Sequence, residues 1–224
     1  MNKYVRVEPS SRVAFPVARA GYPIIGVAAF VTAVFALLSL TLPALLGVAA
    51  TLFTCYFFRD PDRVIPDQTD AVVSPADGKV IKIEKIQDSR FYDGPSLKIS
   101  IFMSIFNVHV NRIPYKGVVK KISYYPGKFF SANLDKASRD NEHNAIFLET
   151  DGGQKICFVQ IAGLVARRII CNIQENDQVH RGRRFGMICF GSRLEVYLPP
   201  ASKIKVRLGD RIIAGTSVLG ELAS

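Results

Sequence analysis

Residues 186–198 read Gly-Met-Ile-Cys-Phe-Gly-Ser-Arg-Leu-Glu-Val-Tyr-Leu, two short apolar runs that meet at a Gly191-Ser192 step. Short runs rich in β-branched and aromatic residues, bounded by small or turn-forming residues, are typical of β-strands. A glycine within such a pattern marks a bulge or a bend. The stretch therefore predicts two strands, 186–190 and 193–198, with a bend between them.

The same pattern extends from this stretch back to about residue 70 and forward to the C-terminus. The other candidate strands are 71–73, 79–84, 97–102, 108–113, 117–124, 144–149, 155–161, 167–171, 204–208 and 217–219. Turn residues separate them, and no strand–helix–strand alternation is present. The most helix-like segment, Ser131–Asn141, is polar. We expect a mainly β fold, a compact all-β sandwich or barrel-like domain.

The chain has a different character before residue 59. From Gly21 to Phe58 it carries no charged residue. A signal peptide has one short apolar core, and one membrane helix needs about 20 residues. The stretch therefore predicts two helices, near 22–40 and 43–58, with a break at Thr41-Leu42-Pro43. The alternative is a pair of core helices in a soluble protein.

Positive residues flank this apolar stretch: Arg12 and Arg19 precede it, and Arg59 and Arg63 follow it. Because positive residues are retained on the cytoplasmic side of a membrane, both ends of the hairpin are expected there. The expected organisation is a basic N-terminal segment 1–20, a membrane-associated helical hairpin 21–58 and a β-rich domain 59–224.

The formal net charge of +10 indicates an anionic partner. No nucleic-acid motif accompanies it, so an anionic membrane surface is the simpler partner and no nucleic acid is expected. The four cysteines form no C-x-x-C pair and have no histidine at zinc-finger spacing. We therefore expect no metal site and no disulfide framework, but reduced thiols in a cytoplasmic domain.

The Gly191-Ser192 step also has a chemical interpretation. A serine hydroxyl can attack the carbonyl carbon of the residue before it, and glycine has no Cβ to obstruct the approach. Elimination of the resulting ester leaves dehydroalanine, which hydrolyses to a pyruvoyl group and ammonia. The hydroxyl needs a base, and the base needs a carboxylate that orients it. The alternative is a purely structural bend.

Candidates for the base and the carboxylate are few. The chain has three histidines, of which His109 shares the polar side of the predicted 108–113 strand with Asn107 and Asn111. Asp77 lies in a tight turn, Ser74-Pro75-Ala76-Asp77-Gly78. A structural histidine and an aspartate that caps its own turn are the alternatives, and spacing alone does not bring either to Ser192.

Taken together, these segments resemble the phosphatidylserine decarboxylases, in particular their short bacterial and archaeal form. The matching segments are Phe57–Pro61, Ser74–Gly78, Asn107–Arg112, Tyr125–Gly127, Ala132 with Asp135–Ser138, Asn141–Glu142 and Phe190–Pro199. Their order after an apolar segment makes the resemblance specific, and they span most of the chain after residue 57.

The resemblance implies that a proenzyme cleaves itself between Gly191 and Ser192. The products are a β chain, 1–191, and an α chain, 192–224, that begins with a pyruvoyl group derived from Ser192. Asp77 matches the aspartate that orients the base, and His109 matches an active-site histidine. Arg112 is a tentative ligand for the substrate's phosphate or carboxylate.

Two positions depart from the longer enzymes of the family. Those enzymes have a second histidine where this chain has Arg112, and Gly-Ser-Thr where it has Gly191-Ser192-Arg193. Both residues fit the short form. They leave open whether His109 serves in self-cleavage and again in turnover. His143 is expected to be non-catalytic.

The implied activity is pyruvoyl-dependent decarboxylation of phosphatidylserine to phosphatidylethanolamine and carbon dioxide. The implied setting is the cell membrane, with the catalytic domain on its cytoplasmic side, in contact with a phospholipid substrate and as a possible homo-oligomer. Three alternatives stay open: a decarboxylase of a soluble amino acid such as aspartate, one acting on an ether-linked isoprenoid lipid, and a membrane-anchored binding module whose chain stays intact.

Overall fold

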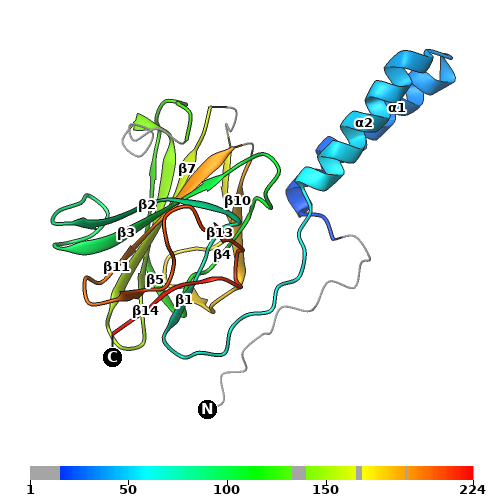
Figure 1. The fold of residues 1–224 in the computed structure, drawn as a ribbon. Coiled ribbons are helices and arrows are strands. Elements are labelled where there is room, and N and C mark those ends of the chain that lie inside the picture. The colour runs from blue at the N-terminus through cyan, green and yellow to red at the C-terminus, as the bar shows by residue number, and fades with distance from the viewer. Residues whose placement is uncertain (1–15, 133–139, 165–167, 190, 224) are drawn as a thin grey trace. The chain divides into compact units, whose positions relative to one another are not determined.

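The structure is a computed structural model that describes residues 16–132, 140–164, 168–189 and 191–223. It divides into two compact units, Met1–Asp62 and Arg63–Ser224. The first unit is helical and the second is built from strands (Figure 1). The prediction of a mainly β fold preceded by apolar helices is confirmed.

The helical unit is a hairpin. A short 3-10 turn, η1 (Arg19–Gly21), leads into α1 (Tyr22–Leu37), and α2 (Thr41–Phe57) follows. The predicted break at Thr41-Leu42-Pro43 was wrong, because the chain turns at residues 38–40 and Ser39 has a φ of 56°. Pro43 instead lies in the first turn of α2, where a helix does not need the missing N–H.

Small residues let the two helices approach closely. A Cβ on Gly47 would lie 2.5 Å from Thr32 Oγ1, and the hydroxyl oxygens of Thr32 and Thr51 are 3.3 Å apart. At the open end of the hairpin the amide of Ala18 donates to the carbonyl of Phe58 at 2.8 Å. Small residues and hydroxyl pairs of this kind are typical of helix packing in membranes.

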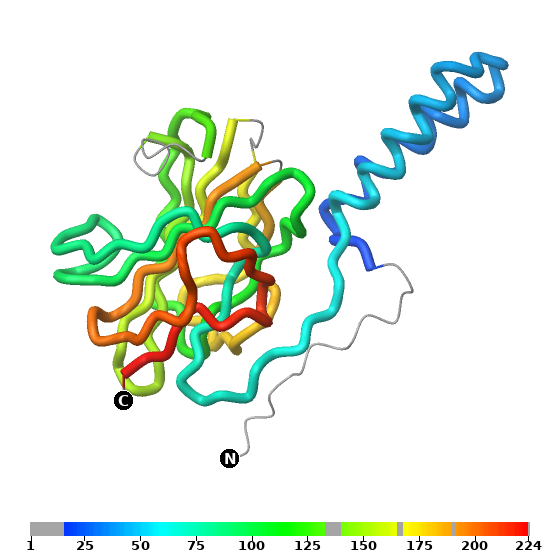
Figure 2. Tube along the Cα trace, viewed as in Figure 1, coloured from blue at the N-terminus to red at the C-terminus, as the bar shows by residue number. Residues whose placement is uncertain are grey.

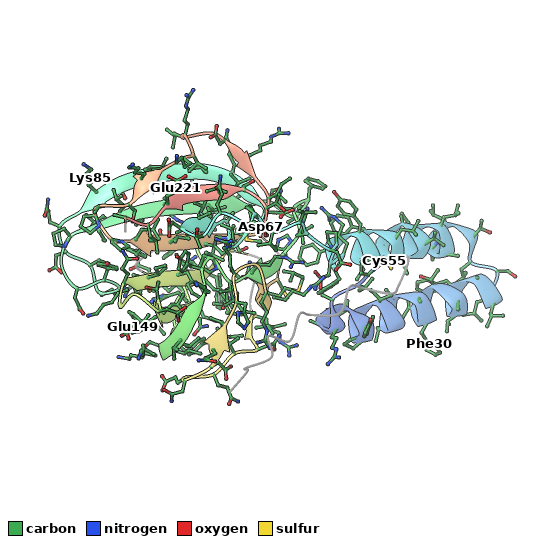
Figure 3. The ribbon with its side chains drawn as sticks, turned by 90° about the horizontal axis from the view of Figure 1, so that it is seen from below. Phe30, Cys55, Asp67, Lys85, Glu149 and Glu221 are labelled. Atoms are coloured by element: carbon green, nitrogen blue, oxygen red, sulfur yellow. The ribbon has the colours of Figure 1, made fainter. Side chains whose placement is uncertain are left out.

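Most side chains of the hairpin are exposed and apolar. Figure 3 shows Phe30 among the side chains that project from α1. In the described part of the chain, only Arg19–Leu37 is long and apolar enough to cross a membrane by length and composition. Helix α2 has 17 residues, which is about 25 Å and shorter than a typical hydrocarbon core of about 30 Å.

The second unit is built from short antiparallel strands. The strands are β1 (Ala71–Val73), β2 (Gly78–Ile86), β3 (Ser96–Met103), β4 (Val110–Arg112), β5 (Gly117–Tyr125), β6 (His143–Glu149), β7 (Lys155–Ala162), β8 (Ile169–Cys171), β9 (Gln178–Val179), β10 (Arg184–Ile188), β11 (Ser192–Leu198), β12 (Lys203–Ile204), β13 (Arg211–Ile212) and β14 (Val218–Glu221).

The main sheet has eight strands in the order β13-β2-β3-β11-β7-β6-β5-β9 and curls on itself (Figure 1). Two smaller sheets, β1-β14-β12 and β4-β10-β8, complete the unit. In Figure 2 the C-terminal segment, drawn red, lies beside the segment that contains β1, with which β14 pairs.

The main core lies on one face of β11. Leu194, Val196 and Leu198 pack there with apolar residues of β3, β6 and β7. The other face is also buried, because Tyr197 packs against Phe91 from the loop after β2. Ser192 lies on the face of Leu194, so it belongs to the interior of the curled sheet.

Most strand predictions are confirmed, but the predicted strand 204–208 was wrong, because only Ile204 of it belongs to a strand, β12. Strands β9 and β13 were missed, since each has only two residues. The predicted 108–113 strand is reduced to β4, and His109 precedes it. Most of the predicted helical segment 131–141 lies outside the described residues.

Candidate active site

Ser192 is the first residue of β11 and lies at one end of the sheet interior. It pairs with Met103 of β3 and with Ala162 of β7, and it is fully buried. Its hydroxyl donates to the sulfur of Met103 at 3.2 Å. A thioether is a weak acceptor, so the hydroxyl loses little interaction energy when it turns toward another atom.

Gly191 holds the chain in a conformation that other residues rarely adopt. Its φ is +66°, in the left-handed region that favours glycine. A Cβ on Gly191 would meet no atom within 4 Å. Glycine is therefore required here by backbone conformation and not by lack of space, and this bend precedes the first strand residue, Ser192.

His109 lies in the loop that joins β3 to β4. The side chain of Asn107 closes this loop, because its Oδ1 accepts from the amide of Ser104 at 2.9 Å. His109 is fully buried, and its Nδ1 lies 2.9 Å from the carbonyl oxygen of Asn107. A carbonyl only accepts, so Nδ1 carries the proton in this bond. The neutral ring then has its basic lone pair on Nε2.

Strand register brings this loop to Ser192. The loop begins after Met103, which pairs with Ser192, and it ends at Val110, which pairs with Met187 of β10. The Gly191-Ser192 bend connects β10 to β11. Both ends of the His109 loop are therefore attached to the two strands that flank the bend, which supports a common site.

Asp77 is held in a defined position by two donors. Its Oδ2 accepts from Arg63 at 2.9 Å, and its Oδ1 accepts from the backbone amide of Ala214 at 2.8 Å. The turn is tied to β4 as well, because the amide of Arg112 donates to the carbonyl of Pro75 at 2.9 Å. Asp77 directly precedes β2, the neighbour of β3. Its role in orienting His109 stays a prediction.

The structure places Arg112 in the interior. It is 5% exposed, and its Nη1 donates to the carbonyl of Gly182 at 2.9 Å. A Cβ on Gly215 would lie 3.0 Å from Arg112 Cδ, so the side chain passes directly beneath that glycine. Arg112 is therefore not a surface residue, and binding of phosphate or carboxylate by Arg112 stays a prediction.

Two buried amide side chains, Gln160 and Asn144, were not found by sequence reasoning, and they are linked to Asn111, which the sequence placed on one strand face with His109. Asn111 Nδ2 lies 3.9 Å from the Met103 sulfur, and Asn111 Oδ1 accepts from Gln160 at 2.9 Å. Gln160 Oε1 in turn accepts from Asn144 at 3.2 Å. These neutral groups form a chain of buried hydrogen-bonded amides that begins beside Met103, the strand partner of Ser192. Only strand register reveals that they meet, because they come from β4, β7 and β6.

A separate charged cluster lies on the opposite face of β11. Arg193 Nη2 is 2.8 Å from Glu195 Oε1, and both side chains are at most 1% exposed. Lys98 Nζ lies 3.3 Å from the same carboxylate, and the Tyr197 hydroxyl donates to Glu195 Oε2 at 2.8 Å. Arg193, the residue after Ser192, is thus held by an ion pair on the face of β11 opposite to the Ser192 side chain.

His143 belongs to this opposite face. It pairs with Ile161, which pairs with Arg193, and it stacks on Tyr125 with ring centroids 4.7 Å apart. Burial lowers the pKa of His143 below its ordinary value, an effect that its bond to the Asn141 carbonyl partly offsets. Its position away from the Ser192 side supports the expectation that His143 is non-catalytic.

Two buried cysteines are poor nucleophiles. Burial raises the pKa of Cys157 well above its ordinary value, and the nearby Glu195 adds to the effect. Burial also raises the pKa of Cys189. Because the thiolate is the reactive form, neither side chain competes with Ser192 near neutral pH.

Comparison with known proteins points to one family. A family model described as phosphatidylserine decarboxylase matches residues 50–220. A phosphatidylserine decarboxylase proenzyme of Desulfotalea psychrophila is 51% identical over 207 residues, which cover 92% of this chain and 97% of the relative. The corresponding proenzyme of Syntrophus aciditrophicus is 57% identical over 177 residues, 79% of this chain and 83% of the relative. The proenzyme of Geotalea uraniireducens is 47% identical over 207 residues, which cover 92% of this chain and 97% of the relative.

Proposed function

The chain belongs to the phosphatidylserine decarboxylase family, and on that premise we propose that it decarboxylates phosphatidylserine to phosphatidylethanolamine after cutting itself between Gly191 and Ser192. The observation that carries the proposal is the bend itself. Gly191, whose φ lies in the left-handed region, precedes the buried Ser192, whose hydroxyl donates to the thioether sulfur of Met103. The proenzyme names of the relatives agree with a chain that is processed.

The self-cleavage can be written with its atoms balanced. Ser192 Oγ attacks the carbonyl carbon of Gly191, a C–O bond forms, the C–N bond breaks, and the proton of the hydroxyl ends on the released amine. Loss of the Ser192 Cα proton then breaks the Cβ–Oγ bond, which leaves Gly191 as a carboxylate and residue 192 as dehydroalanine. Water converts this residue to a pyruvoyl group and releases ammonia.

His109 is the proposed base for this sequence. Because its Nδ1 proton is directed to the Asn107 carbonyl, the lone pair on Nε2 is the atom that accepts a proton. The Asn107 carbonyl thus accepts the hydrogen bond from Nδ1, which an aspartate accepts in a serine–histidine–aspartate triad. Asp77, fixed by Arg63 and Ala214, is proposed to support the base electrostatically from the neighbouring turn.

The surroundings of Ser192 fit a pyruvoyl group at that position. Ser192 is fully buried, its partner Met103 is 3.9 Å from Asn111 Nδ2, and Asn111 in turn accepts from Gln160, so the neighbouring polar side chains are neutral amides. When present, the group supplies the electron-withdrawing carbonyl that decarboxylation of an amino acid needs. The chain's own residues exclude water from it, and His109 is placed to hold or deliver a proton beside it. Arg112 is the tentative ligand for the substrate's phosphate or carboxylate.

The hairpin is proposed to keep the β-rich catalytic domain, 59–224, at the membrane that contains its substrate. In support, Arg19 precedes α1 and Arg59 follows α2, and backbone bonds from Ala18 to Phe58 and from Asp60 to Pro16 hold these two segments together. Positive residues at both ends favour the cytoplasmic side for them. The net charge of +10 favours an anionic lipid surface. Self-association into a homo-oligomer remains part of the proposal.

The test is the mass of the denatured protein, measured beside that of Ser192→Ala. We expect two chains, 1–191 and 192–224, the second lighter than its sequence by one ammonia, and a single chain for the variant. The cut protein is then assayed with three substrates in turn: phosphatidylserine in vesicles, free serine in solution and free aspartate in solution. Carbon dioxide from the lipid alone supports the proposal. Turnover of free aspartate in place of the lipid would identify a decarboxylase of a soluble amino acid instead.

A further inference from the structure

Gly163 lies directly against the bond that the proposed function requires to break. It follows Ala162, the β7 partner of Ser192. A Cβ built on Gly163 would lie 2.0 Å from the carbonyl oxygen of Gly191 and 2.9 Å from its carbonyl carbon. Both distances are far below van der Waals contact. Any side chain at position 163 therefore requires the Gly191 carbonyl to move.

The requirement for glycine at this position is spatial. Gly191 has a φ of +66°, whereas Gly163 is not among the glycines with positive φ. Alanine at 163 would thus suit the local backbone conformation, and its only conflict would be with the atoms it meets. The two glycines serve different ends, since Gly191 makes the bend and Gly163 leaves room for the carbonyl of the bend.

The segment that carries Gly163 is held in place. The amide of Ala162 donates to the carbonyl of Glu142 at 2.9 Å, and the carbonyl of Ala162 accepts from Asn141 Nδ2 at 2.7 Å. Asn141 is fully buried and also bonds both backbone polar groups of Phe130. A Cβ on Gly163 would therefore displace the Gly191 carbonyl more readily than its own strand.

We propose that Gly163 is a positioning residue for self-cleavage: it lets the Gly191 carbonyl take the orientation in which Ser192 Oγ attacks its carbon, and Asn141 fixes the strand that provides this space. This inference rests on the proposed function and adds two residues to it. Attack on a carbonyl depends steeply on the direction of approach, and a displacement of about 1 Å reduces a rate by about a hundredfold.

The experiment compares Gly163→Ala with Gly117→Ala in the full chain. A Cβ on Gly117 would lie 2.3 Å from the carbonyl oxygen and 3.0 Å from the carbonyl carbon of Glu149. This conflict is nearly the same, but it lies at the opposite end of β6 from His143. The appearance of chain 192–224 is followed by denatured mass after synthesis. We expect cleavage about a hundredfold slower for Gly163→Ala and close to the wild-type rate for Gly117→Ala.

Two further readouts separate positioning from a general loss of structure. In the uncut Ser192→Ala background, the melting temperatures of the two alanine variants are expected to fall by similar amounts. Hydroxylamine, which cleaves an ester but not an ordinary peptide bond, is expected to release chain 192–224 from wild-type precursor during processing. It should release little from Gly163→Ala, because the ester does not form.

The outcomes are distinguishable. Cleavage of Gly163→Ala at the wild-type rate overturns the inference, as does slowing of both alanine variants in proportion to their losses of melting temperature. If Gly163→Ala does not fold, Asn141→Ala replaces it, with about tenfold slower cleavage expected and an unchanged rate overturning the inference. A wild-type chain that stays whole and insensitive to hydroxylamine would refute the proposed function itself.

Discussion

Arg193 and Glu195 lie two residues apart on β11, and their side chains meet at 2.8 Å on the face opposite to Ser192. Neither is more than 1% exposed. A buried ion pair of this kind contributes little net stability, but removal of one member leaves the other charge without compensation. The pair therefore anchors Arg193, the residue that follows the proposed cleavage point.

Glu195→Ala is expected to destabilise the domain by about 3–5 kcal/mol, because the Arg193 guanidinium stays buried without its carboxylate. The measurement is denaturant unfolding of the uncut Ser192→Ala protein, so that a single chain is compared. Asp93→Ala is the control, because Asp93 forms an ion pair with Lys155 in which the two side chains are 90% and 65% exposed, respectively. Exposed ion pairs of this kind contribute little to stability. Equal decreases in the free energy of unfolding of the two variants would contradict a special role for the buried ion pair.

His143 is expected to make stability depend on pH. Burial lowers its pKa in the folded protein, so below about 6.5 the unfolded chain binds more protons than the folded one. Above pH about 6.5, the free energy of unfolding therefore includes the full contribution of neutral, buried His143. This contribution is lost as the pH falls through the pKa of His143 in the folded protein. Unfolding free energies between pH 7.5 and 5, with Ser192→Ala as parent, should fall less steeply in His143→Gln. Identical slopes would refute this prediction.

Self-cleavage is expected to survive that same substitution. His143 and Ser192 belong to opposite faces of the main sheet, as the pairing of His143 with Ile161 and of Ala162 with Ser192 requires. In the Ser192-containing chain, His143→Gln should therefore yield chains 1–191 and 192–224 at a rate within about threefold of wild type. An uncut His143→Gln protein with a retained melting transition would give this histidine a part in the chemistry.

Asp77→Asn is expected to slow self-cleavage by about 10²–10⁴-fold, the range for loss of one participant in acid–base catalysis. The change keeps an oxygen for the amide of Ala214 but removes the negative charge opposite Arg63. The measurement is the amount of uncut chain over time, with melting temperature as the check on folding. A variant that is cut at the wild-type rate would reduce Asp77 to a turn residue.

The sequence predicted those parts of the molecule that depend on neighbouring residues. Most strands with several alternating positions were found, although the alternating segment 204–208 contributes only Ile204 to β12. The Gly191-Ser192 step was identified because its chemistry involves two adjacent residues. The two-residue strands β9 and β13 carry no period and were missed. The hairpin turn was misplaced because Pro43 was taken as a break, whereas Ser39 makes the turn.

The remaining parts of the site depend on register between distant strands. Gln160 meets Asn111 only because β7 and β4 lie at the same end of the sheet interior, and Gly163 meets Gly191 only because β7 pairs with β11. Neither relationship has a signal within one segment. A glycine required for space also looks the same in sequence as a glycine required for a turn.

Removal of residues 1–62 is expected to separate membrane attachment from self-cleavage. All the proposed cleavage residues belong to the unit Arg63–Ser224, and Arg63, the partner of Asp77, is retained. The shortened chain should therefore still yield 192–224, but it loses the apolar helices α1 and α2. Flotation with vesicles that contain phosphatidylserine should recover the full chain and leave the shortened one at the bottom of the gradient. Decarboxylation of phosphatidylserine by the shortened chain should fall when the lipid is in vesicles and recover when it is dispersed in detergent. If the shortened chain floats with the vesicles, the main membrane contact lies instead in the β-rich unit.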